Sequence, residues 1–176
     1  MIKEYDYSDI IFKKDNEKII TLVDNLFSDD VWDKNSPPFQ TLPNLYEYSE
    51  CNILFSSFLD SCCAYKNNNL NAKMFRMWCY KDTGLNFFIE KRNRHEELWH
   101  DHQQDYVDEG LSGIYYLKNT KKISTEFKGY KIKNPKEFSW YIFPSRLKHR
   151  PPKIPFFTKR YTIAADLFFD ANYLNK

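Results

Sequence analysis

The sequence predicts a mainly β fold, in which strands of the C-terminal part form a barrel or sandwich and helices of the N-terminal part pack outside it. Two observations support this class. From Lys73 onward the apolar residues change from a helical repeat to a period of two, and strand-like runs recur with turn residues between them. Aromatic residues form 18% of the chain, and there are only 4 glycines, a composition that favours half-buried strands over glycine-rich phosphate loops.

The N-terminal part predicts one short strand and two helices. The apolar residues 10–12 predict the strand. Apolar residues at helical spacing predict a helix over Asp15–Leu26, with Asp15 as its N-cap, and a second helix over Ser49–Tyr65. The proline-containing stretch 28–45 between them is interpreted as a loop. Because each helix has a single apolar face, both are expected to lie against one side of a sheet.

The C-terminal part predicts six or seven strands. They are expected at 73–81, 85–89, 98–103, 111–117, 125–127, 138–143 and 161–169. We find no repeat and no low-complexity linker, so residues 1–176 are predicted to form one domain. In that domain, residues 1–72 would be a helical support region and residues 73–170 the strand core.

Charge gives no indication of a nucleic-acid partner. The formal net charge is only +2, from 26 basic and 24 acidic residues, so a nucleic-acid function is unsupported. The lysine-rich stretches 118–122 and 128–136 are interpreted as solubilising hairpin ends.

Cysteine usage and hydropathy indicate a cytoplasmic protein. The four cysteines, Cys51, Cys62, Cys63 and Cys79, include no C-x-x-C pair, and free thiols in a reducing compartment are expected. The N-terminus has no apolar leader segment, and no run of residues is long and apolar enough for a membrane span.

Candidate metal ligands occur in the sequence Trp99-His100-Asp101-His102. Successive side chains of a strand point to opposite faces, so His100 and His102 would share a face that Asp101 does not. Two imidazoles one residue apart match a metal-ligand spacing, although an H-x-H pair alone is weak support. A third histidine, His149, follows the predicted strand that ends at Pro144. In a closed double sheet, opposite strands come together at the open end. His149 can therefore lie near His100 and His102 although it is far from them in sequence.

A candidate anion site follows at Arg160 and Thr162, which share a face of the last predicted strand. A guanidinium group can hold a carboxylate through two parallel hydrogen bonds, and a hydroxyl beside it can add a third. The pair could therefore bind one carboxylate group of a dicarboxylate.

These features follow one another in a characteristic order: H-x-H at 100–102, Leu-Ser-Gly-Ile-Tyr-Tyr-Leu at 111–117, Phe-Pro-Ser at 143–145 before His149, and Arg-x-Thr at 160–162. In this order the chain resembles the iron(II)- and 2-oxoglutarate-dependent oxygenases, particularly the small prolyl-4-hydroxylase-like members of bacteria and phages. The resemblance covers residues 73–169. It implies a double-stranded β-helix, a jelly roll of cupin-like type, supported by the N-terminal helices.

The resemblance also implies a site. Iron(II) would be held by His100, His102 and His149. The far carboxylate of 2-oxoglutarate would be held by Arg160 and Thr162, with help from Tyr115 or Tyr116, between which the sequence does not choose.

The chain departs from the family pattern at His102, where a carboxylate is the rule. Three interpretations stay open. His102 itself replaces the carboxylate and the metal meets three histidines. Alternatively, Asp101 or Asp105 supplies the carboxylate through a bulge or bend. In the third interpretation the metal site has been lost and the protein binds another ligand.

The activity that the resemblance implies is hydroxylation, in which dioxygen is reduced while 2-oxoglutarate is converted to succinate and carbon dioxide. The substrate would be a peptidyl residue or a small molecule. Two other functions stay open: a cupin-like metal-binding protein and a non-catalytic β-sandwich that serves as a binding module. The cupin alternative is disfavoured, because its usual glutamate would fall at Tyr106 or Val107.

Overall fold

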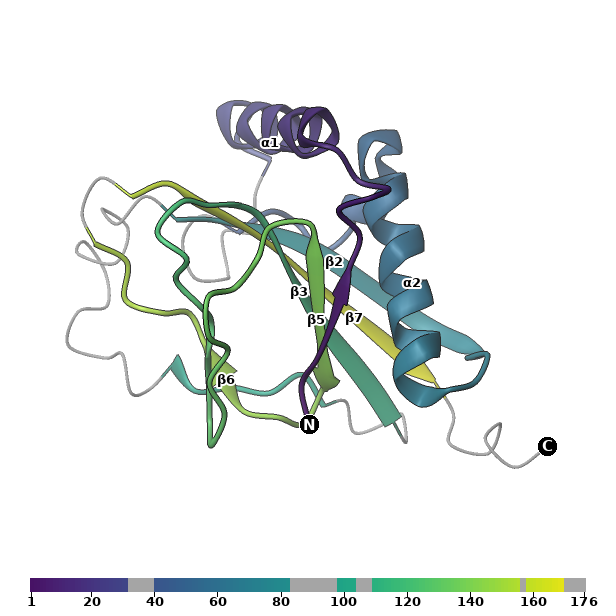
Figure 1. Ribbon diagram of the computed structural model, residues 1–176. Coiled ribbons are helices and arrows are strands. Elements are labelled where there is room, and N and C mark those ends of the chain that lie inside the picture. The colour runs from purple at the N-terminus through teal and green to yellow at the C-terminus, as the bar shows by residue number, and fades with distance from the viewer. Residues whose placement is uncertain (32–39, 83–97, 104–108, 156–157, 170–176) are drawn as a thin grey trace.

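An antiparallel sheet of five strands is covered on one face by two helices (Figure 1). The computed structural model describes residues 1–31, 40–82, 98–103, 109–155 and 158–169. The described helices are α1 (Lys13–Ser28) and α2 (Asn52–Lys66), with short 3-10 helices at Leu45–Glu47 and Ser49–Cys51. The described strands are β1 (Lys3–Asp6), β2 (Ala72–Asp82), β3 (Glu109–Asn119), β4 (Glu126–Phe127), β5 (Ser139–Pro144), β6 (His149–Arg150) and β7 (Arg160–Phe169). The large sheet has the order β1-β5-β3-β7-β2, and β4 and β6 form a second, small sheet.

Both predicted helices are present, with shifted ends. Asp15 is not the N-cap of α1: its carboxylate accepts a hydrogen bond from the backbone N–H of Phe12 at 3.0 Å, and Phe12 occupies the cap position. The carboxylate thus acts from inside the first turn, where it also complements the helix dipole. Helix α2 ends at Asn67, which takes the left-handed conformation (φ 58°) that asparagine tolerates better than most residues.

The strand predicted at residues 10–12 is wrong. These residues form a turn in which the backbone N–H groups of Ile10 and Ile11 both donate to the carbonyl of Tyr7. The side chain of Ile10 is 59% exposed, so the short apolar run does not mark a buried strand. The first strand is instead the polar β1, which pairs with β5 at one edge of the sheet. The strand predicted at 85–89 lies outside the described residues.

The helix-covered face of the sheet carries the main apolar core. Side chains from β3, β7 and β2 alternate between the two faces, and those on this face pack under α1 and α2. Contact is close at Gly113, where an added Cβ would lie 2.7 Å from the ring of Phe58 on α2. Glycine is therefore required here because the helix and the strand approach each other so closely. Central members of this core are Leu54, Phe58, Leu111, Tyr115, Ile163 and Leu167.

A second layer faces the opposite side of the sheet. His100 and His149 exchange backbone hydrogen bonds of 2.9 and 3.0 Å, which adds the His100 segment to the small β4-β6 sheet. The strand predicted over 98–103 is reduced to this single bridge, because His102 donates its N–H away from it, to the carbonyl of Ser145. Phe127, Phe143 and Tyr116 belong to the second apolar cluster, which lies between the two layers. No helix in the described part of the chain is long and apolar enough to cross a membrane.

Candidate active site

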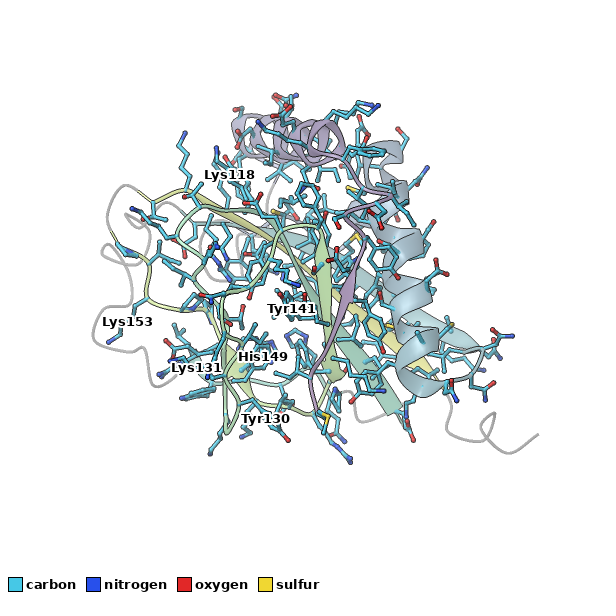
Figure 2. All side chains as sticks on the ribbon, in the orientation of Figure 1. Lys118, Tyr130, Lys131, Tyr141, His149 and Lys153 are labelled. Carbon is cyan, nitrogen blue, oxygen red and sulfur yellow. The ribbon has the colours of Figure 1, made fainter. Side chains whose placement is uncertain are left out.

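Three histidines from two separate segments meet between the two layers. Nitrogen atoms of His100, His102 and His149 lie within 4.8 Å of one another, close enough to hold one metal ion. The rings of His100 and His102 are stacked, with centroids 5.1 Å apart, and the His149 ring lies 4.6 and 4.8 Å from them. Figure 2 shows His149 on the side of the sheet that faces away from α1 and α2. The sequence-predicted histidines thus come together although His149 lies 47 positions after His102 in the chain.

Each of the three rings has its Nδ1 atom beside an oxygen acceptor. Nδ1 of His100 lies 2.8 Å from the carbonyl oxygen of Leu98, and Nδ1 of His149 lies 2.9 Å from that of Leu147. Nδ1 of His102 lies 2.7 Å from a carboxylate oxygen of Asp166. A carbonyl or carboxylate oxygen can only accept, so the proton of each neutral ring belongs on Nδ1 and the lone pair on Nε2. Outer hydrogen bonds of this kind orient histidine ligands in metal sites.

Sequence reasoning missed Asp166, which is fully buried in the middle of β7. The residue lies between two strand neighbours, Arg76 on β2 and Ser112 on β3, in one row across the sheet. Arg76 donates to one carboxylate oxygen of Asp166 at 2.9 Å, and Ser112 donates to the other at 2.6 Å. An aspartate in an otherwise apolar strand could have been noticed, because a buried carboxylate requires partners.

The protonation states favour metal binding. Burial, and then the neighbouring charges of His102 and His100, lower the pKa of His149 to about 3. Desolvation also lowers the pKa of His100, although its side chain reaches the surface. Burial acts to raise the pKa of Asp166, but the charge and hydrogen bond of His102 and the Arg76 guanidinium outweigh it, so the net pKa is lowered. At neutral pH the cluster therefore presents neutral His100 and His149 beside an ionised carboxylate.

Arg160 lies in the same space without a counter-ion among the described residues. Its side chain is 3% exposed, and one nitrogen donates to the hydroxyl of Thr125 at 3.1 Å. Its Nε atom and the hydroxyl of Thr162 are buried and have no hydrogen-bond partner in the described part of the chain. A buried cation and an unsatisfied hydroxyl are costly unless something pairs with them, so the two groups form a ready anion site.

Tyr115 and Tyr116 point to opposite faces of the sheet. The guanidinium of Arg160 lies over the ring of Tyr116, 5.1 Å from its centroid, and the Tyr116 hydroxyl accepts a hydrogen bond from the N–H of Thr125 at 3.0 Å. The hydroxyl of Tyr115 instead donates to the side chain of Asn16 on α1 at 3.0 Å. Only Tyr116 therefore adjoins the anion site.

A cavity of about 480 Å³ joins the histidines to the anion site. Its lining includes His100, His102, His149, Arg160, Thr162, Trp78 and Tyr80. A volume of this size suits a small cofactor together with part of a substrate.

The alternative carboxylate ligands are placed differently. Among the described residues, the group that could hold a metal consists of the three histidines without Asp101, whose side chain is exposed. Asp105 lies outside the described residues. The carboxylate that adjoins the cluster is Asp166, and it contacts a histidine ring instead of the shared centre.

The arrangement of strands is found in solved structures of other proteins. A prolyl-4-hydroxylase from Pseudomonas putida aligns with a TM-score of 0.57 at 9% identity, covering 96% of this chain and 92% of its own. The viral collagen prolyl hydroxylase from Paramecium bursaria Chlorella virus-1 aligns with a TM-score of 0.59 at 12% identity, covering 97% and 90%. This chain has the prolyl hydroxylase fold.

A third structure of this fold contains a peptide. It is a prolyl hydroxylase from Trichoplax adhaerens in complex with a fragment of the hypoxia inducible factor oxygen degradation domain, with a TM-score of 0.58 at 15% identity and coverage of 99% and 87%. Comparison with protein-family models and with curated proteins found no match.

The prolyl hydroxylase fold confirms the fold class predicted from the sequence. The five-stranded sheet and the smaller layer that faces it are the two sides of the double-stranded β-helix, with α1 and α2 as the predicted supporting helices.

Proposed function

We propose that the protein is an iron(II)- and 2-oxoglutarate-dependent hydroxylase in which three histidines hold the metal. One observation carries the proposal. Three histidine rings converge in the same cavity that holds a buried arginine without a counter-ion among the described residues. A cupin-like metal protein or a non-catalytic sandwich would explain the histidines or the fold, but neither explains the anion site.

The residues present fit an iron(II) ion. Imidazole nitrogen suits iron, and three ligands on one face leave positions open for a co-substrate and dioxygen. Asp166 supplies the negative charge that an aspartate in place of His102 would otherwise provide, but from behind the imidazole ring. With iron(II) and 2-oxoglutarate bound, the site would supply the oxidation by dioxygen that converts a substrate C–H bond to C–OH.

The residues also fit 2-oxoglutarate. Arg160 and Thr162 would hold its far carboxylate, and the ring of Tyr116 lies against the Arg160 guanidinium. Such charge-assisted hydrogen bonds inside a buried cavity are stronger than those between neutral groups. The walls formed by Trp78, Ile114 and Phe143 would keep water from the reacting atoms.

We infer that the substrate is a peptidyl residue. All three solved structures of this fold described above are prolyl hydroxylases, and one of them was determined with a peptide. The cavity is partly open to solvent, which would admit one side chain of a longer chain.

The proposal is tested by thermal unfolding with Mn(II) in place of iron. A ligand that binds only the folded state raises the melting temperature. Mn(II) is expected to raise it, and 2-oxoglutarate is expected to raise it further only when Mn(II) is present. If 2-oxoglutarate adds nothing in the presence of Mn(II), the co-substrate assignment is wrong.

Thr162→Val and Ser139→Ala form a matched pair for this test. Each removes a buried hydroxyl without a partner among the described residues, but Ser139 does not line the cavity. Thr162→Val is expected to weaken 2-oxoglutarate binding roughly tenfold, the contribution of one hydrogen bond to a charged group. Ser139→Ala is expected to bind it as the wild type does. Succinate formation on addition of iron(II), dioxygen and a peptide then tests the reaction itself.

A further inference from the structure

The small net charge of the chain conceals a strong segregation of charge. Residues 118–160, which connect β3 to β7, contain 13 of the 26 lysines and arginines. The same stretch contains only two of the 24 acidic residues, Glu126 and Glu137. The remainder of the chain is therefore acidic overall, and the stretch that carries His149 is strongly basic. Interpreting these lysines only as solubilising hairpin ends does not explain why they gather in one stretch of the chain.

Part of this basic stretch lines a second hollow, of about 780 Å³, which we call the lysine groove. Its rim holds four exposed lysines, Lys122, Lys131, Lys133 and Lys153. Figure 2 shows Lys131 and Lys153 on the side of the molecule where His149 lies, away from α1 and α2. No ion pair among the described residues involves any of the four. The one acidic residue among the described lining, Glu126, is already paired with Arg150 at 2.7 Å.

The lysine groove adjoins the histidine site. Thr125 lines both the lysine groove and the active-site cavity. Trp99 of the groove directly precedes His100, and the ring of Trp99 lies 4.4 Å below the Arg150 guanidinium, which directly follows His149. A chain that lay in the groove could therefore place one of its residues at the metal.

The walls of the groove are held in place without a ligand. The side chain of Asn119 exchanges hydrogen bonds of 2.9 and 3.0 Å with the backbone of Ile123, which fixes the turn that carries Lys122. Preorganised walls lower the entropy cost of binding.

The lining favours an acidic peptide over a nucleic acid. Single-stranded nucleic acids bind to open aromatic faces on which bases stack. Here the Arg150 guanidinium already covers one face of Trp99, and Tyr130, 48% exposed, is the more open ring. Isolated ammonium groups around an apolar floor of Phe127 and Ile132 suit carboxylates interleaved with apolar side chains.

We propose that the lysine groove binds an acidic segment of the polypeptide substrate, next to the residue that enters the cavity. Only the reaction of the neighbouring residue in the cavity rests on the proposed function. Binding of the acidic segment in the groove requires neither metal nor 2-oxoglutarate.

The test is a fluorescence-anisotropy titration of the full chain with labelled oligoglutamate, without metal. Oligoglutamine and oligothymidylate of equal length serve as probes for uncharged peptide and for nucleic acid. We expect oligoglutamate to bind most tightly and its affinity to fall with added salt, because exposed charges are screened. Lys131→Gln with Lys133→Gln is expected to weaken binding roughly five- to tenfold.

Lys14→Gln with Lys18→Gln is the matched control, because it removes the same charge from exposed positions of α1 on the other side of the sheet. This variant is expected to bind within about twofold of the wild type. Equal weakening by both double variants would show an effect of total charge and overturn the proposal. Tighter binding of oligothymidylate, or equal binding of oligoglutamine, would overturn it as well. None of these outcomes changes the Mn(II) and 2-oxoglutarate test, so the two proposals fail separately.

Discussion

The two faces of β7 carry different tasks. Residues Tyr161, Ile163, Ala165, Leu167 and Phe169 face the helices and belong to the main apolar core. Between them, Arg160, Thr162 and Asp166 face the cavity or its histidines. Every residue named is buried, so burial alone does not distinguish the faces. The difference lies in what each side chain contacts. On the helix face the side chains pack against apolar neighbours, whereas the cavity face holds polar groups that require hydrogen-bond or charge partners.

This division between the two faces of β7 explains how the fold tolerates the polar face. A buried arginine, threonine and aspartate in one strand would destabilise a fold that depended on that strand face for its core. Here the core lies on the other face, under α1 and α2, and keeps the strand in place. We therefore expect substitutions on the helix face to change stability and substitutions on the cavity face to change ligand binding.

The largest effect is expected for Ile163→Ala. Ile163 is fully buried beneath the helices, and the substitution leaves a cavity that costs about 3 kcal/mol of the free energy of unfolding. Urea unfolding measures this loss. In the folded variant, Mn(II) affinity is expected to stay within about twofold of the wild type, because Ile163 touches no ligand group. A large loss of Mn(II) affinity at a temperature where the variant is folded would contradict the division between the faces.

Asp166→Asn is expected to act mainly on the metal. The substitution removes the charge behind His102 and should lower Mn(II) affinity roughly 10- to 100-fold, as other losses of outer partners do. Isothermal titration with Mn(II) measures it. Arg76→Gln is the control: it breaks the ion pair with Asp166 but leaves the carboxylate on His102. If Arg76→Gln weakens Mn(II) binding as much as Asp166→Asn, the aspartate acts only through the stability of the sheet.

The residues that the sequence could not reveal are those whose role depends on neighbours across the sheet. Period-two alternation predicted most of β3, β5 and β7, and the order of motifs brought out the histidines, Arg160 and Thr162. Asp166 was missed because its partners, Arg76 and Ser112, come from two other strands and no local pattern links them. The strand expected at 98–103 failed for a related reason: His100 pairs with His149, whereas the N–H of His102 donates to the carbonyl of Ser145, so no continuous ladder forms.

The metal-free protein is expected to lose stability in weak acid because of His149. Its pKa is about 3 in the folded state and about 6.5 in the unfolded chain, so between these values the unfolded state binds the extra proton. Stability from this group is therefore full above pH 6.5 and falls as the pH drops, by about 2 kcal/mol at pH 5. Urea unfolding at pH 7 and pH 5 should show a smaller loss in His149→Gln. An unchanged loss in that variant would mean that other groups dominate the acid response.

The smallest and sharpest comparison uses the two adjacent tyrosines, Tyr115→Phe and Tyr116→Phe. Each substitution removes one buried hydrogen bond, from Tyr115 to Asn16 or from the Thr125 N–H to Tyr116, and each should cost about 1 kcal/mol of unfolding free energy. Only Tyr116 adjoins Arg160, so only Tyr116→Phe should weaken 2-oxoglutarate binding, roughly fivefold, in the presence of Mn(II). Melting temperatures and 2-oxoglutarate titrations of both variants measure the two effects. Equal weakening by both substitutions would mean that the helix face and the cavity face are coupled, because Tyr115 could then reach the ligand only through the sheet.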